Sequence, residues 1–142
     1  MADTSPGFHF RYRMCGAPAT IQDLLHKDTE TLTKGDIVNL ESGEIDLGAT
    51  GDTNLLGAVQ ETGAGTDSTT RKKVIVDADA VYGVYDANAR LKGATLDLSG
   101  ATGAQTVGAS SNKEFVVVKD SAADEETLVR FNVGKHHDNV AL

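Results

Sequence analysis

Two groups of side chains in this sequence have the chemical type of metal ligands. His136 and His137 are adjacent, so in an extended segment their rings point to opposite sides and rarely share one ion. Asp77, Asp79 and Asp86 suggest calcium, but the fifth position of their segment is apolar where a calcium loop needs an oxygen ligand. We therefore expect a solvated tail at the histidines, turns at the aspartates, and neither a metal site nor another cofactor.

The sequence also shows no nucleophilic side chain with an identifiable base partner. Arg13 lies close to Cys15 and favours a thiolate there, but His9 is six residues away and no base can be assigned. The segments 63–66 and 100–103 are rich in glycine, yet neither carries the lysine of a phosphate-binding loop. We interpret both segments as flexible loops and expect no catalytic residue.

One short segment supports an enzymatic alternative. Gly43-Glu44-Ile45-Asp46 loosely resembles the Gly-x-Ile-Asp segment of dUTPases, in which the aspartate serves catalysis. Those enzymes are all-β trimers of similar length. The tyrosine that follows their aspartate, their Arg-Ser-Gly phosphate motif and their glycine-rich arm with phenylalanine have no counterpart here. A trimeric nucleotide hydrolase is therefore the alternative, and a non-enzymatic protein is the main prediction.

Composition and charge narrow the class of partner. The 142 residues carry a net charge of −8, and residues 21–70 hold two lysines and ten acidic residues. An acidic chain is a poor nucleic-acid binder because phosphate attraction dominates that affinity. The single cysteine cannot form an internal disulfide, and no apolar run is long enough for a signal peptide or a membrane span. We expect no nucleic acid and no membrane as partner, and synthesis in a cytosol.

The segment from residue 8 to 15 alternates apolar and polar side chains with the period of a β-strand. The apolar side chains are Phe8, Phe10, Tyr12 and Met14. The polar ones are His9, Arg11 and Arg13. Gly16 and Pro18 then separate the segment from the rest. It fits either an arm that contacts another subunit or an edge strand of the protein's own barrel.

We assign residues 1–31 to an extended N-terminal arm, with Phe8, Phe10, Arg11, Tyr12 and Arg13 as its contact residues.

Residues 32–142 alternate short apolar segments with turn residues, as β-strands and their connections do. The clearest signal is a hairpin in which 37–41 and 44–47 flank Ser42-Gly43. Further strands are expected over residues 55–62, 71–76, 80–85, 94–98, 115–118 and 128–133, with a loop over 99–112. Thr20-Ile21-Gln22-Asp23 resembles a helix capping box, so a short helix or an extended connection precedes residue 27. The pattern predicts an all-β fold, a small barrel or sandwich of about eight short strands.

The stretch from Leu32 to Val133 is similar to the lambda-type β-barrel head-decoration, or cement, proteins of tailed bacteriophages. Three segments carry the resemblance: Leu32-Thr33-Lys34-Gly35-Asp36-Ile37-Val38, Leu56-Gly57-Ala58-Val59 and Ala80-Val81-Tyr82-Gly83-Val84-Tyr85-Asp86-Ala87-Asn88-Ala89. The resemblance also includes chain length, loop composition and segment order.

The resemblance implies a homotrimer of compact barrels that binds the outside of the expanded capsid and clamps copies of the major capsid protein. It implies a location on the virion surface and no catalytic residue. A generic β-barrel binding or adhesin module is the second alternative. Such a module would place aromatic side chains in its loops, and the loops of this sequence have almost none.

Overall fold

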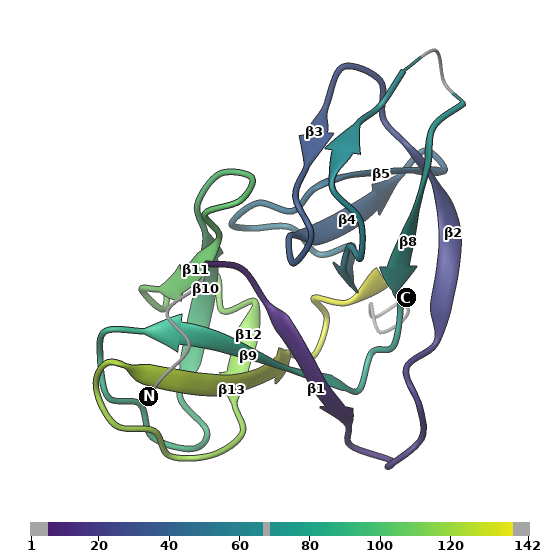
Figure 1. Ribbon diagram of the computed structural model, residues 1–142. Helices are drawn as coiled ribbons and strands as arrows, with labels where there is room; N and C mark the ends of the chain where they lie inside the picture. The colour runs from purple at the N-terminus through teal and green to yellow at the C-terminus, as the bar shows by residue number, and fades with distance from the viewer. Residues whose placement is uncertain (1–5, 67–68, 138–142) are drawn as a thin grey trace.

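The computed structural model describes residues 6–66 and 69–137, which form thirteen β-strand segments in three sheets (Figure 1). The six-stranded sheet has the order β1 (His9–Arg13), β9 (Ala80–Asp86), β13 (Glu125–Phe131), β12 (Phe115–Val117), β10 (Thr95–Ser99) and β11 (Thr106–Gly108). The five-stranded sheet has the order β6 (Leu55–Ala58), β4 (Ile37–Glu41), β5 (Glu44–Leu47), β2 (Ile21–His26) and β8 (Arg71–Ile75). A third sheet pairs β3 (Thr31–Leu32) with β7 (Gly63–Ala64). The predicted all-β class is confirmed, although the expected eight strands are too few.

The five-stranded sheet closes into a small barrel. Val59, next to the end of β6, bridges Val74 of β8, and the Gln60 amide donates to the Lys73 carbonyl at 2.7 Å. Closure pairs the two outer strands, which would otherwise leave backbone groups open. The interior is filled by aliphatic side chains, and its fully buried members are Leu32, Val38, Ile45, Val59 and Val74.

The larger core lies between this barrel and the six-stranded sheet. Ile37, Leu55, Ala58 and Ile75 come from the barrel strands, yet they pack in one cluster with residues of the six-stranded sheet. Strand β4 therefore buries side chains on both faces, with Val38 inside the barrel and Ile37 toward the other sheet. The two sheets share one core.

A row of stacked rings runs through this core. Phe8 stacks on Phe115 with ring centroids 5.1 Å apart, and Phe115 stacks on Phe131 at 5.3 Å. Phe131 meets the His136 ring at 5.1 Å, and that imidazole donates to the Leu56 carbonyl at 2.8 Å. The prediction of a solvated tail is wrong at His136, because a hydrogen bond and a ring contact hold the buried imidazole in place.

Buried polar side chains also connect the two sheets. The Gln105 side chain accepts from the Ile37 amide at 2.6 Å and donates to the carbonyls of Ile37 and Gly48. The Asp36 carboxylate accepts from the Thr102 hydroxyl at 2.6 Å and from the Gly103 amide at 2.9 Å. The loop before β11 is therefore fixed against β4, and the flexible loop predicted over 100–103 is anchored.

The predicted hairpin is confirmed as β4 and β5. Ser42 and Gly43 both have positive φ, 52° and 81°, which is the backbone of a tight two-residue hairpin turn. Residues 20–23 lead into β2, so the extended alternative holds and the short helix does not. Strand β11 was missed because residues 99–112 lack large apolar side chains. Strand β13 begins at Glu125, three residues before the strand expected over 128–133.

The arm predicted over residues 1–31 is not separate from the barrel in the described part of the chain. Strand β1 pairs with β9, and β2 pairs with β5 and β8. The edge-strand alternative describes β1, because Phe8, just before the strand, belongs to the core and Phe10 packs against it. Residues 1–5 lie outside the described residues.

Candidate functional site

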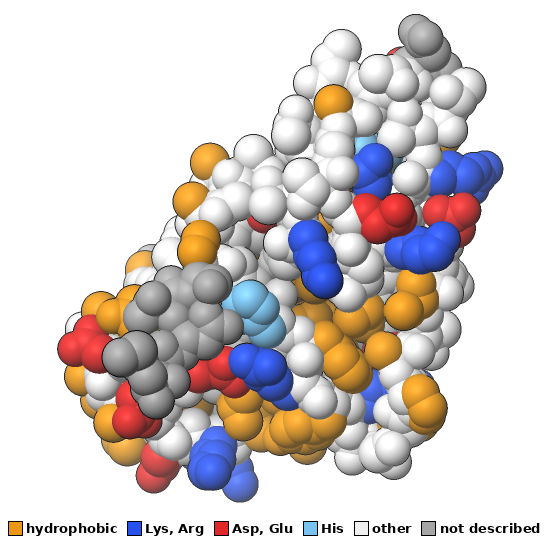
Figure 2. Space-filling model, in the orientation of Figure 1, with side chains coloured by type: hydrophobic (Ala, Val, Ile, Leu, Met, Phe, Trp, Pro, Cys, Tyr) orange, Lys and Arg blue, Asp and Glu red, His pale blue; other side chains and the backbone are white. Residues whose placement is uncertain are grey.

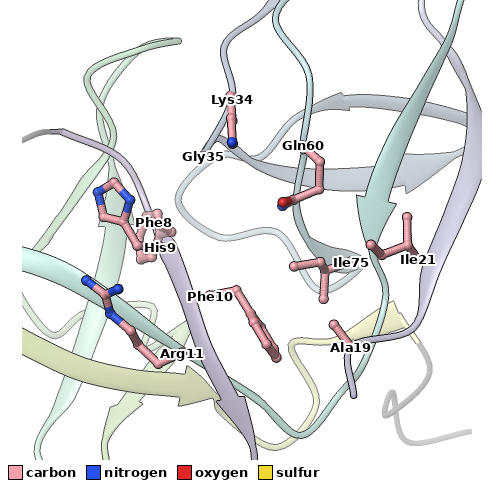
Figure 3. Close-up of a pocket in the computed structure, with 10 residues that line it drawn as sticks. All are labelled: Phe8, His9, Phe10, Arg11, Ala19, Ile21, Lys34, Gly35, Gln60 and Ile75. Carbon is pink, nitrogen blue, oxygen red and sulfur yellow. The ribbon is translucent and has the colours of Figure 1, made fainter.

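A depression lies beside β1, between the two sheets. It has a volume of about 590 Å³. Its lining residues are Phe8, His9, Phe10, Arg11, Ala19, Ile21, Lys34, Gly35, Gln60 and Ile75. We call it the β1 groove (Figure 3).

Strand β1 forms one wall of the groove and is the outer strand of its sheet. The Phe8 amide donates to the Gly35 carbonyl at 2.8 Å, and the Met14 amide donates to the Asp79 carbonyl at 3.0 Å. Both ends of β1 are therefore fixed. Among the described strands, only β9 pairs with β1, so the backbone groups on its other edge face the groove.

The floor and the opposite wall are apolar. Ile21 on β2 pairs directly with Ile75 on β8, and Ile75 is buried while Ile21 is 52% exposed. Phe10 and Ala19 are half-buried and pack against the large core. Figure 2 shows a patch of hydrophobic side chains on this face, between the two sheets. This patch offers contact area to a ligand without a change in the fold.

One end of the groove is polar. The Lys34 side chain points toward the groove from the turn before β4, and the Gln60 side chain points in beside it (Figure 3). The described residues include no acidic side chain in ion-pair contact with Lys34, and the lining of the groove contains no carboxylate. In a chain of net charge −8, this end attracts an anionic group.

The predicted contact residues divide between several positions. Phe8 is 2% exposed and belongs to the core, and Phe10 and Arg11 line the groove. The pairing register shifts between Phe10 and Tyr12, so a β-bulge turns Tyr12 away from the face that Phe10 shares with Tyr82. Strict alternation placed these aromatic residues on one face, and the bulge is why that prediction is wrong for Tyr12.

The two arginines of β1 already have acidic partners inside the chain. The Arg11 guanidinium forms a two-pronged ion pair with Glu126, and Figure 3 shows it pointing away from the groove. Arg13 donates to Asp79 at 2.8 Å and lies 3.4 Å from Asp77. Burial opposes ionisation of Asp79, but hydrogen bonds from Arg13 and the Cys15 backbone outweigh it and lower its pKa. These arginines fix β1 and the turn before β9.

The segment that resembles a dUTPase lies at a second, smaller pocket of about 210 Å³. Its lining residues are Lys27, Glu41, Ser42, Glu44 and Asp46. The single ammonium, on Lys27, lies 3.3 Å from the Asp46 carboxylate. A triphosphate would meet three carboxylates and one lysine that is already paired, so the pocket disfavours that substrate.

The residues considered as metal ligands are dispersed. Asp77 accepts from the Thr20 amide at 2.7 Å, and Asp86 pairs with Arg90. Within residues 6–66 and 69–137, no three His, Cys, Asp or Glu side chains are grouped so that they could hold a metal ion. The same residues contain no helix with the length and apolarity required to cross a bilayer.

Sequence reasoning missed Lys34, Gln60, Ile21 and Ile75 as parts of one site. They come from four separate segments, and only the closure of the barrel brings them beside β1. The signal that could have indicated this site was Ile21, because it is a large apolar residue at the exposed start of a strand.

No protein-family model matches the chain, and a search of curated proteins gives no significant match.

Proposed function

We propose that this protein is a non-enzymatic structural subunit that binds the outer surface of an expanded bacteriophage capsid. In this role it acts as a homotrimer and stabilises the capsid by bridging copies of the major capsid protein. The resemblance of residues 32–133 to head-decoration proteins motivates the proposal.

The observation that carries the proposal is the edge of β1 beside an apolar groove. An open strand edge offers main-chain hydrogen bonds to an extended segment, and neighbouring side chains select its register. The β1 groove also exposes Ile21 and half-exposes Phe10, which are ready contact area. Such a surface suits a binding role that needs no chemical step.

The proposed attachment differs from the arm expected from the sequence. Because Phe8 is part of the core, it supports β1 and does not itself reach the capsid. Phe10 is the aromatic residue of this segment that borders the groove. Contact through a fixed groove costs little ordering entropy, and three copies in a trimer multiply weak contacts.

The test combines the purified protein with expanded capsids assembled from the major capsid protein encoded beside its gene. We expect co-sedimentation with capsids, trimer-shaped density on their outer surface by electron microscopy, and greater resistance of the capsids to heat. Analytical ultracentrifugation should give a trimer. Failure to bind, or a gene neighbourhood without capsid, portal or protease genes, would favour the generic binding module. Steady hydrolysis of dUTP with magnesium, abolished by Asp46→Asn, would favour the enzyme.

A further inference from the structure

We infer that the β1 groove binds an extended peptide segment of a partner protein, which adds to β1 as a new edge strand. The segment places a carboxylate at Lys34 and an aliphatic side chain against Phe10 and Ile21. The inference rests on the proposed function for the identity of the partner, the major capsid protein, but not for the chemistry of the segment.

The backbone of β1 supports strand addition. Hydrogen bonds at Phe8 and Met14 fix its two ends, so the strand is ordered before a partner arrives. Its pairing with β9 uses one edge and leaves the other toward the groove. A strand that is ordered in advance loses little entropy on binding, so it is a good template for an added strand.

The charge of the groove selects the polar part of the ligand. Lys34 supplies an ammonium at one end, and the ten lining residues include no carboxylate. The chain as a whole is acidic, with a net charge of −8, and Lys34 is one of only two lysines among residues 21–70, which hold ten acidic residues. A partner segment with an acidic residue finds its favourable position at Lys34 and is repelled by most other surfaces.

The shape of the groove selects an extended peptide over a small molecule. The groove lies beside β1, with Ala19, Ile21 and Ile75 across from the strand and Phe10 projecting from β1 toward them (Figure 3). Pockets for small molecules bury most of their ligand, whereas this one leaves a long side exposed to solvent. Alternate side chains of an added strand point to the same face, so a carboxylate and an aliphatic residue two positions apart can reach both ends.

The experiment uses labelled eight-residue peptides of alternating valine and threonine. One series carries a single glutamate in place of the valine at position 3, 5 or 7, so that valines two positions away share its face, and a matched series carries lysine there. Fluorescence polarisation measures their binding to the wild-type protein, to Lys34→Glu and to Lys92→Glu. Lys92 is an exposed lysine outside the groove, so its variant controls for the change in net charge.

We expect at least one glutamate peptide to bind the wild-type protein and Lys92→Glu equally. Lys34→Glu should bind that peptide with an affinity about fivefold lower or more, because one accessible ion pair is lost. The same variant should bind the matched lysine peptide instead. Amide exchange should slow in β1 when the peptide binds. No binding by any peptide, or equal loss in both lysine variants, would overturn the inference.

Capsid binding by the same variants separates this inference from the proposed function. If capsids bind Lys34→Glu as well as wild type, the groove is not the attachment site and the inference fails while the function stands. If the glutamate peptide binds but capsids do not, the function fails and the inference about peptide chemistry stands. If Lys34→Glu only dissociates the trimer, the groove holds a second copy of this chain and the inference fails.

Discussion

Gly83 has no side chain, and this allows an ion pair to join β1 to β13 across β9, the strand that lies between them. Glu126 on β13 reaches Arg11 on β1 by lying over Gly83 of β9. A methyl group at position 83 would overlap the Glu126 carboxylate. The glycine is required here for space, because its backbone is ordinary extended strand.

Gly83→Ala should displace the Glu126 side chain from Arg11, because the added methyl overlaps only this flexible, partly exposed side chain. Gly83→Ala and Glu126→Ala should therefore each cost less than about 1 kcal/mol, since both lose the same partly exposed ion pair. The double variant should cost no more than either single variant, because all three lose one and the same contact. Urea unfolding measures all three, and Gly108→Ala, where an added methyl meets nothing, is the matched control. A double variant that loses the sum of the two single effects would contradict the overlap.

His26 is a buried histidine inside the five-stranded barrel. Its side chain is fully buried, and neither ring nitrogen has a hydrogen-bond partner among the described residues. Burial, reinforced by the positive charge of Lys72, lowers its pKa below the ordinary 6.5, against the opposing effect of Asp46 and Asp28. The folded protein therefore keeps this imidazole neutral.

The lowered pKa predicts a loss of stability in mild acid. Below about pH 6.5 the unfolded chain binds a proton at His26 that the folded protein does not, so the free energy of unfolding falls with pH. The contribution of His26 is complete above pH 6.5 and decreases by at most about 1.4 kcal/mol per pH unit below it. His26→Leu should remove this slope and stay folded in the apolar barrel. Urea unfolding from pH 7.5 to 5.5 tests this, and identical slopes in both proteins would contradict it.

At the scale of the elements, β1 is a strand of the fold, and the aromatic residues near its two ends differ: Phe8, just before it, is buried, and Tyr12 is exposed. Phe8→Ala should destabilise the protein by about 3–5 kcal/mol, because the ring stacks in the core between Phe115 and Tyr82. Tyr12→Ala should cost less than about 1 kcal/mol, because Tyr12 is 42% exposed beyond the bulge. Thermal unfolding measures both variants. A small effect of Phe8→Ala on the melting temperature would instead support the prediction that this segment is an independent arm.

Elements with a strong local signal were predictable, and those that depend on distant partners were not. The hairpin of β4 and β5 was predicted because turn chemistry and alternation agree over eleven residues. Alternation also identified β1 as a strand, but it does not say which sheet accepts a strand, and a bulge leaves no mark in composition. Burial of His136 depends on Leu56 and Phe131, so nothing in the polar tail indicates it.

At the scale of the whole molecule, the two sheets should unfold together because they share one core. Tyrosine fluorescence reports only the six-stranded half, where all three tyrosines lie, whereas far-ultraviolet circular dichroism reports both halves. The two signals should give coincident transitions. Separate midpoints would show two independent units.

Gln105→Ala should lower the stability of both sheets by the same amount, about 3 kcal/mol. The substitution leaves buried backbone groups of Ile37 and Gly48 without the hydrogen bonds that the Gln105 side chain makes to them. Gln60→Ala, which loses one part-buried hydrogen bond, should cost about 1 kcal/mol and serves as control. Native-state amide exchange measures each half separately. Loss confined to one half would contradict the shared core.

The row of rings from Phe8 to His136 also governs when the protein can fold during its synthesis. A ribosome adds about 5–20 residues per second, so Phe8 is made on the order of ten seconds before the ring that completes its stack. The five-stranded barrel draws on residues 21–76 and can pair its strands while translation continues. The six-stranded sheet cannot form until its last strands, β12 and β13, have been synthesised. Until then the aromatic residues of the nascent chain are accessible to chaperones.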